Sequence, residues 1–101
     1  PPLIEGDHPN AAYAWLNQCR KGVEVRFVKL KAESDVANAD SFRGIVDART
    51  KAVCLSHVSF HAGQRHDIAD IGRFCKERGI YLVVDAMQSV GVLPIDVRAM
   101  N

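Results

Sequence analysis

Two kinds of phosphate-binding loop are missing from this sequence. Neither the GxGxxG pattern of dinucleotide-binding folds nor the GxxxxGK pattern of P-loop enzymes occurs in its 101 residues. Both loops use glycines so that backbone N–H groups can surround a phosphate. A dinucleotide-binding domain and a P-loop domain are therefore disfavoured. A receiver-like phosphoacceptor domain is disfavoured as well, because no acidic pair follows the first predicted strand.

The sequence also has almost no excess charge of either sign. Thirteen Lys and Arg residues oppose twelve Asp and Glu residues, which leaves a formal net charge of +1. Nucleic-acid-binding domains usually carry a clear positive excess, so we expect neither nucleic acid nor a membrane as a partner. No apolar run approaches the roughly 18 residues of a membrane-spanning helix, and the first residues lack the charged-then-apolar order of a signal peptide. We expect a cytoplasmic protein.

The three cysteines show no pairing pattern. Cys19, Cys54 and Cys75 are widely spaced, and none belongs to a CxxC motif. Each lies inside an apolar pattern, which predicts buried free thiols in a reducing compartment.

The histidines show no metal-site spacing. His8, His57, His61 and His66 include no pair four residues apart on a predicted helix, and no cysteine stands at zinc-finger spacing from them. We therefore predict no metal site. His61 and His66 fall in one predicted loop, and we expect both at the surface.

Apolar periodicity predicts alternating strands and helices. Strands are predicted at residues 2–5, 23–28, 52–55 and 81–85, and helices at 11–20, about 40–48, and from Asp67 to Gly79. This alternation predicts an α/β fold, with a mostly parallel sheet and helices on both faces in three α/β/α layers. The alternating pattern of 23–28 favours a place near the sheet edge, and the apolar run of 81–85 favours a strand buried on both faces.

Capping residues mark the ends of two predicted helices. Asn10 is predicted as the N-cap of the first helix, and Gly22 follows its end. Asp67 is predicted as the N-cap of the third helix, and Gly79 as its stop. The predicted apolar faces consist of Ala12, Trp15, Leu16 and Cys19 in the first helix and Ile68, Ile71, Phe74 and Cys75 in the third.

Polar residues follow three of the predicted strands. The loop with His8 follows the first strand, Ser56 and His57 follow the third, and Asp85 and Gln88 end the fourth. Parallel strands bring such residues to one edge of the sheet, where α/β folds hold ligands. A charge there is costly unless something pairs with it. Asp85 therefore either caps the following turn or binds a protonated ring nitrogen or a metal. For His57 taken alone, a structural role is favoured.

Four motifs follow one another along the chain. In chain order they are His8-Pro9 followed by Trp15-Leu16, residues 49–51, residues 56–60 with Gly63 and Asp67, and residues 83–91 with 93–97. Together they resemble the class V pyridoxal-phosphate-dependent enzymes of fold type I, which include class V aminotransferases and cysteine desulfurases. The resemblance covers nearly the whole chain. It implies that residues 1–101 are a single partial large domain, the cofactor-binding one, truncated at both ends.

The resemblance also implies roles for three residues. Asp85 would pair with the pyridinium nitrogen of pyridoxal 5'-phosphate, Gln88 would reach the phenolic oxygen, and His8 would stack on the ring. The family's Schiff-base lysine lies beyond the aspartate, and residues 86–101 contain no lysine. No catalytic residue is therefore assigned within this chain, and we expect the chain alone to be inactive.

For the full-length protein the resemblance implies a homodimeric class V aminotransferase-like enzyme that acts on an amino acid or keto acid. A cysteine desulfurase or selenocysteine lyase is the alternative within the family. Phe60 and Ala11 stand where such relatives often have asparagine, which favours the aminotransferase. A non-catalytic α/β binding module is the alternative outside the enzyme class.

Overall fold

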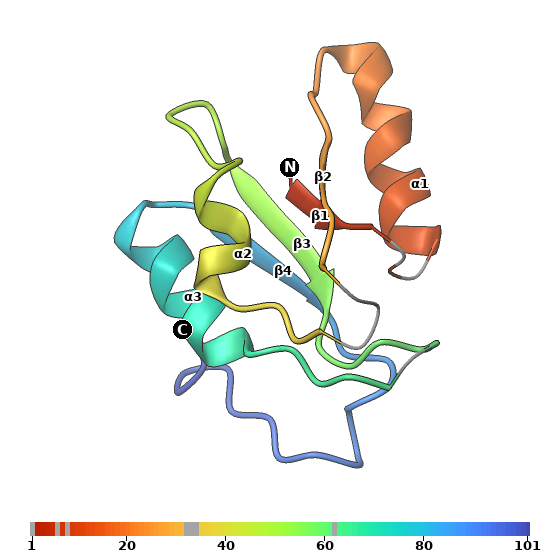
Figure 1. The fold of residues 1–101 in the computed structure, drawn as a ribbon, viewed down its shortest axis with the longest axis vertical. Helices are drawn as coiled ribbons and strands as arrows, with labels where there is room; N and C mark the ends of the chain where they lie inside the picture. The colour runs from red at the N-terminus through yellow and green to blue at the C-terminus, as the bar shows by residue number, and fades with distance from the viewer. Residues whose placement is uncertain (1, 6, 8, 32–34, 62) are drawn as a thin grey trace.

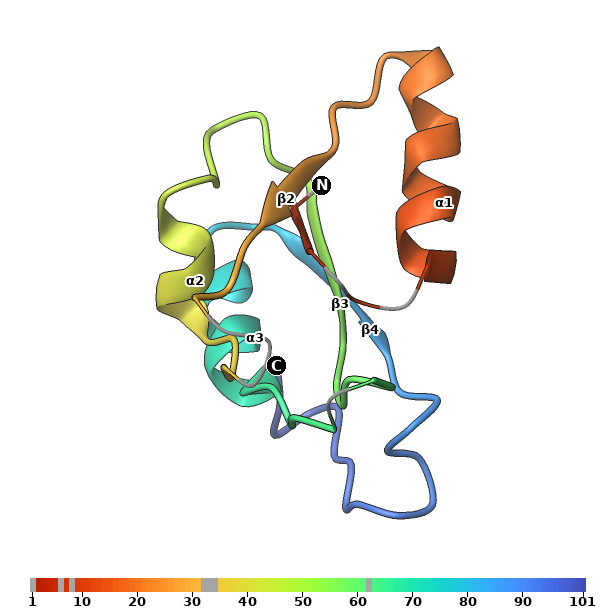
Figure 2. The same cartoon turned by 45° about the vertical axis from the view of Figure 1, so that its right-hand side comes forward.

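The computed structural model describes residues 2–5, 7, 9–31, 35–61 and 63–101. Its sheet has four parallel strands in the order β2-β1-β3-β4. The strands are β1 (Pro2–Ile4), β2 (Arg26–Val28), β3 (Ala52–Ser56) and β4 (Tyr81–Asp85). Helix α1 (Pro9–Gln18) and the short 3-10 helix η1 (Cys19–Lys21) lie on one face, and α2 (Ala39–Arg43) and α3 (Ile68–Glu77) lie on the other (Figures 1 and 2). The predicted three-layer α/β fold is confirmed.

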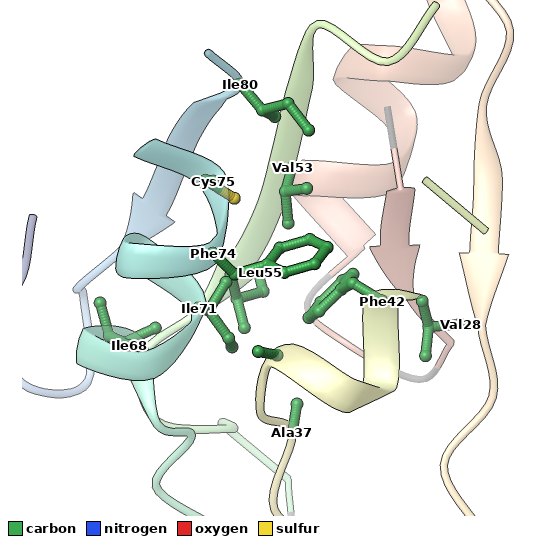
Figure 3. Close-up of a cluster of buried hydrophobic side chains, with 11 residues drawn as sticks. Val28, Ala37, Phe42, Val53, Leu55, Ile68, Ile71, Phe74, Cys75 and Ile80 are labelled. Atoms are coloured by element: carbon green, nitrogen blue, oxygen red, sulfur yellow. The ribbon is translucent and has the colours of Figure 1, made fainter. Parts of the chain in front are cut away.

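The hydrophobic core lies between the sheet and helices α2 and α3 (Figure 3). Side chains alternate between the two faces of a strand. Val53 and Leu55 of β3 therefore enter this core, each with 0% exposure, while Cys54 faces the α1 side. The core consists of Val28, Ala37, Ala39, Phe42, Val53, Leu55, Ile68, Ile71, Phe74, Cys75 and Ile80.

Helix α3 has the predicted ends. The Asp67 side chain accepts a hydrogen bond from the N–H of Asp70, as an N-cap does. Gly79 has a φ of 64°, a left-handed conformation that glycine adopts without steric cost. The chain reverses there, and the N–H of Ile80 bonds to the carbonyl of Cys75 at 2.9 Å. In the described part of the chain, no helix has both the length and the apolar character needed to cross a membrane.

Helix α1 differs from the prediction in its start and in its burial. It begins at Pro9, so Asn10 lies in the first turn and is not the N-cap. Proline is favoured at the first helical position because the N–H it lacks has no partner there. No side chain of α1 is buried, and Leu16 is 42% exposed. Cys19, just after the helix, is exposed too, which corrects its predicted burial.

Helix α2 is shorter than predicted, because it ends at Arg43 instead of continuing to residue 48. Asp47 accepts a hydrogen bond from the N–H of Arg49 at 2.8 Å, and Thr50 Oγ1 accepts one from the N–H of Asp47 at 3.0 Å. Such side-chain bonds to nearby backbone compete with the helical pattern. The sequence from 47 to 50 therefore forms a turn.

Strand β4 forms one edge of the described sheet, and the prediction that both of its faces are buried is wrong. Leu82 and Val84 pack against the core, whereas Tyr81 is 78% exposed and Val83 is 43% exposed. The reason is that α3 packs on only one of its faces. The central strand β3 is the more deeply buried one. Strand β2 lies at the other edge, as its alternating pattern predicted.

Candidate functional site

The carboxyl ends of β1, β3 and β4 lie together at the lower end of the sheet in Figure 1. We call this end the carboxyl edge of the sheet, as distinct from its edge strands β2 and β4. The parallel register pairs Leu3 with Cys54 and Ser56 with Asp85. Asp7, after β1, accepts a hydrogen bond through Oδ2 from the N–H of Ser56 at 2.7 Å, across 49 residues of sequence. The structure thus brings strand-end groups from three parts of the chain together.

Asp85 lies half-buried at this edge. Its Oδ1 accepts a hydrogen bond from the N–H of Met87 at 2.9 Å, so the residue does cap the turn that follows β4. Among the described residues none donates a hydrogen bond to its Oδ2. The two interpretations of Asp85 are therefore compatible, because capping occupies one carboxylate oxygen and leaves the other for a ligand.

Gln88 lies three residues further on, in the turn after β4, and its side chain is exposed. An amide placed there has donors and an acceptor to offer a ligand held beside Asp85. His8, the third predicted ligand-binding residue, falls outside the described residues.

His57 and Ser89 form a buried pair that the sequence analysis missed. His57 Nδ1 lies 2.9 Å from Ser89 Oγ, and the two residues are 2% and 0% exposed. Burial, with a smaller effect from the charge of Arg65, lowers the pKa of His57 below its ordinary value. The ring is therefore neutral at pH 7. The feature of the sequence that could have indicated Ser89 is its position directly after Gln88, a predicted cofactor-binding residue.

Asp7 was missed as well, although an acidic residue just beyond a strand is a recognisable signal. Its bond to Ser56 ties the loop after β1, which also contains His8, to the end of β3. Charge-assisted hydrogen bonds of this kind are short and comparatively strong. Asp7 therefore supports the edge of the sheet at which Asp85 lies.

The loop between β3 and α3 is closed by hydrogen bonds between its two sides. The N–H of His66 bonds to the carbonyl of His57 at 2.8 Å, and the N–H of Ser59 bonds to the carbonyl of Gln64 at 2.9 Å. His61 is exposed, as predicted, but His66 is only 3% exposed. The expected surface position of His66 is wrong because its ring takes part in the packing of this loop. Within the described residues no cluster of His, Cys, Asp or Glu is arranged to hold a metal ion.

The buried ring of His66 predicts a pH dependence of stability. Its Nδ1 accepts a hydrogen bond from the N–H of Ala37 at 3.0 Å, which requires the neutral ring. Burial lowers the pKa of His66, Asp7 partly opposes this shift, and His57 adds to it. The unfolded chain binds the proton at a pKa of about 6.5 and the folded chain only at a lower pH. The stability present above about pH 6.5 is therefore lost as the pH falls toward the folded pKa.

This loss can be measured as the thermal unfolding midpoint of the full-length protein between pH 8 and pH 5. His66→Asn keeps an acceptor near the Nδ1 position but removes the titration, so we expect a flatter profile. His61→Asn, at the exposed histidine of the same loop, should keep the original slope. Equal slopes in all three proteins would contradict the assignment to His66.

None of the three cysteines is placed as a nucleophile at this edge. Burial raises the pKa of the Cys54 thiol, and raises that of Cys75 to about 11. Such thiols are almost fully protonated at neutral pH, and the thiolate is the reactive form. Cys19 follows helix α1, which runs opposite to the strands and ends at the other edge of the sheet (Figure 1).

A cavity of about 730 Å³ opens between α3, β4 and the last residues of the chain. Its lining is mainly apolar, with Ile68, Val84 and Ile95 among the residues that contribute. Asp85 and Gln88 do not line it. Lys76 contributes a charged group to this lining, whereas the two predicted ligand-binding residues lie at the sheet edge.

Nearly the whole chain matches one protein family. The family model described as aminotransferase class-V matches residues 3–101. The chain belongs to this family. Class V aminotransferases and the related cysteine desulfurases are pyridoxal-phosphate enzymes, so the predicted family and its cofactor class are confirmed.

Relatives of this class V chain include both branches of the family. An uncharacterized aminotransferase of Schizosaccharomyces pombe is 37% identical over 99 residues, which are 98% of this chain and 25% of the relative. A probable cysteine desulfurase of Methanothermobacter thermautotrophicus is 36% identical over 100 residues, which are 99% of this chain and 24% of the relative. The chain thus spans about a quarter of the length of these curated relatives.

A solved structure agrees with the class V assignment in fold. It is a C-DES mutant in which glycine is covalently linked to the PLP cofactor. The two structures superpose with a TM-score of 0.84 at 26% sequence identity, over 99% of this chain and 28% of the other. The predicted fold type I architecture is therefore confirmed.

Proposed function

We propose that residues 1–101 are part of the cofactor-binding domain of a longer pyridoxal-phosphate-dependent enzyme. Support comes from the family match over residues 3–101 and from the relatives, which are about four times as long. The Schiff-base lysine and the phosphate-binding turn would come from outside this chain.

The residues at the sheet edge fit the cofactor. The observation that carries the proposal is the Asp85 carboxylate, which is half-buried with Oδ1 bonded to Met87 and Oδ2 without a described donor. Oδ2 would accept a hydrogen bond from the pyridinium nitrogen and keep that nitrogen protonated. The Gln88 amide would bond to the phenolic oxygen, and the His8 ring would stack on the cofactor face. When bound, the protonated cofactor ring serves as an electron sink.

The reaction we propose is amino-group transfer between an amino acid and a keto acid. The sequence identity to a relative named as an aminotransferase supports this reaction. Phe60 and Ala11 support it too, because they stand where desulfurase-type relatives often have asparagine. The full-length protein would be a cytoplasmic homodimer, and the two buried free thiols of this chain agree with a reducing compartment.

A cysteine desulfurase is the second candidate, because several relatives carry that name. That reaction requires a reactive thiol, and the buried Cys54 and Cys75 have raised pKa values. The thiol would have to be supplied from outside residues 1–101.

The absorption spectrum of the full-length protein tests the proposal. We expect a cofactor band in the near-ultraviolet to visible range, either as purified or after pyridoxal phosphate is added and the unbound excess is removed. Keto-acid formation from a panel of amino acids would support the aminotransferase, and sulfide release from cysteine would support the desulfurase. A protein that shows no band after incubation with saturating pyridoxal phosphate and removal of the unbound excess would contradict the enzyme proposal and favour a binding module.

A further inference from the structure

One side chain joins the two loops at the carboxyl edge of the sheet. His57 follows β3, and Ser89 lies in the turn after β4, yet His57 Nδ1 and Ser89 Oγ are 2.9 Å apart. With exposures of 2% and 0%, the pair is shielded from competing water. A hydrogen bond in such surroundings is stronger than one at the surface.

His57 is itself held by its backbone. Its N–H bonds to the carbonyl of Asp85 at 2.9 Å, and its carbonyl accepts a bond from the N–H of His66 at 2.8 Å. The ring therefore projects from a backbone that is fixed on both sides. The segment from Asp85 to Ser89 is in turn connected to His57 at both of its ends.

Ser89 completes the connection within its own turn. Its N–H bonds to the carbonyl of Ala86 at 2.9 Å, and its Oγ lies 3.3 Å from the same carbonyl oxygen. A hydroxyl has one proton to donate and can also accept. When Oγ donates to Ala86, it accepts from the Nδ1–H of His57, and a neutral ring can make this contact.

We propose that His57, acting through Ser89, is a positioning residue that sets the Asp85 carboxylate and the Gln88 amide against the cofactor ring. The inference rests on the proposed function. Both ligand-binding residues lie inside the segment that His57 connects, with Asp85 at its first bond and Gln88 directly before its second. A loop held at only one end would let the carboxylate move away from the ring nitrogen.

The test compares two cofactors in the full-length protein. One is pyridoxal phosphate, and the other is its analogue in which carbon replaces the ring nitrogen. The wild-type protein should bind the first more tightly, because only that ring can pair with Asp85. In Ser89→Ala and His57→Phe this preference should fall about fivefold to tenfold, as expected for the loss of one buried hydrogen bond.

Three further proteins make the result specific. His57→Asn keeps a polar atom near Nδ1 and should restore most of the preference. His61→Phe, at an exposed histidine of the same loop, should leave the preference unchanged. The thermal unfolding midpoint of each variant identifies a protein that has failed to fold. If a His57 variant fails to fold, the cofactor preference of Ser89→Ala, the smallest change, decides whether the positioning role holds.

Other outcomes separate the two proposals. A folded Ser89→Ala protein that keeps the full preference, or loses affinity for both cofactors equally, overturns the positioning role and leaves the proposed function intact. A wild-type protein that binds neither cofactor overturns the proposed function and the inference together. A wild-type protein that binds both equally overturns the pairing of Asp85 with the ring nitrogen, and with it the positioning role.

Discussion

Replacing Asp85 with asparagine in the full-length protein should weaken the binding of pyridoxal phosphate about tenfold to hundredfold. Asparagine has nearly the same shape and can still accept the hydrogen bond from the N–H of Met87. It has no charge to offer the pyridinium nitrogen, and a charge-assisted bond contributes about 1.5–3 kcal/mol. Titration of the cofactor band measures this loss. Activity should fall further, because the unprotonated ring is a weaker electron sink.

Asp96 supplies a matched control for this substitution. Its Oδ1 accepts hydrogen bonds from the N–H groups of Arg98 and Ala99 at 2.9 and 3.1 Å, so it caps a turn much as Asp85 does. Asp96→Asn should leave cofactor affinity unchanged. If Asp85→Asn behaves like Asp96→Asn, the carboxylate of Asp85 is a turn cap only.

Replacing Phe42 with alanine should produce the largest loss of stability in the chain. Phe42 lies in α2 with 0% exposure, and its ring enters the core beside Phe74 (Figure 3). Removing a buried ring forfeits its transfer free energy and leaves a cavity, which costs about 3–5 kcal/mol. That is a large share of the roughly 5–15 kcal/mol by which a domain is stable.

Amide hydrogen exchange in the full-length protein measures this loss locally. The amides of Val53 and Leu55 in β3 should exchange faster in Phe42→Ala, because this core packs against their strand. Phe27→Ala is the control, since Phe27 lies on the edge strand β2 and is 44% exposed. It should change exchange in β3 far less. Similar effects of the two substitutions would contradict the position assigned to Phe42.

The most accurately predicted bounds in the chain are those of α3 and of the strands on either side of it. The apolar spacing of Ile68 and Ile71, the cap at Asp67 and the stop at Gly79 are all local signals. These signals depend only on residues within one or two helical turns, so they can be recognised directly in the sequence. The errors in the bounds of α1 and α2 are local as well: a proline starts α1 at Pro9, and residues 47–50 form a turn where the prediction had continued α2.

The candidate site was predicted in outline. The position of Asp85 at the end of an apolar strand indicates a ligand-binding edge independently of the family resemblance. The contacts that build this edge could not be predicted, because Asp7 and Ser56 are 49 residues apart and His57 and Ser89 are 32 apart. No periodicity connects residues at such distances.

By itself the sequence determined the family, the alternation of strands and helices, and the place of Asp85 and Gln88 after a strand, since motifs and capping are properties of neighbouring residues. Only the tertiary structure decided the strand order β2-β1-β3-β4, the exposure of one face of β4, and the burial of His57 and His66. These depend on which segments pack together. Packing is decided by the total burial and hydrogen bonding of the whole fold, and no single segment contains that information.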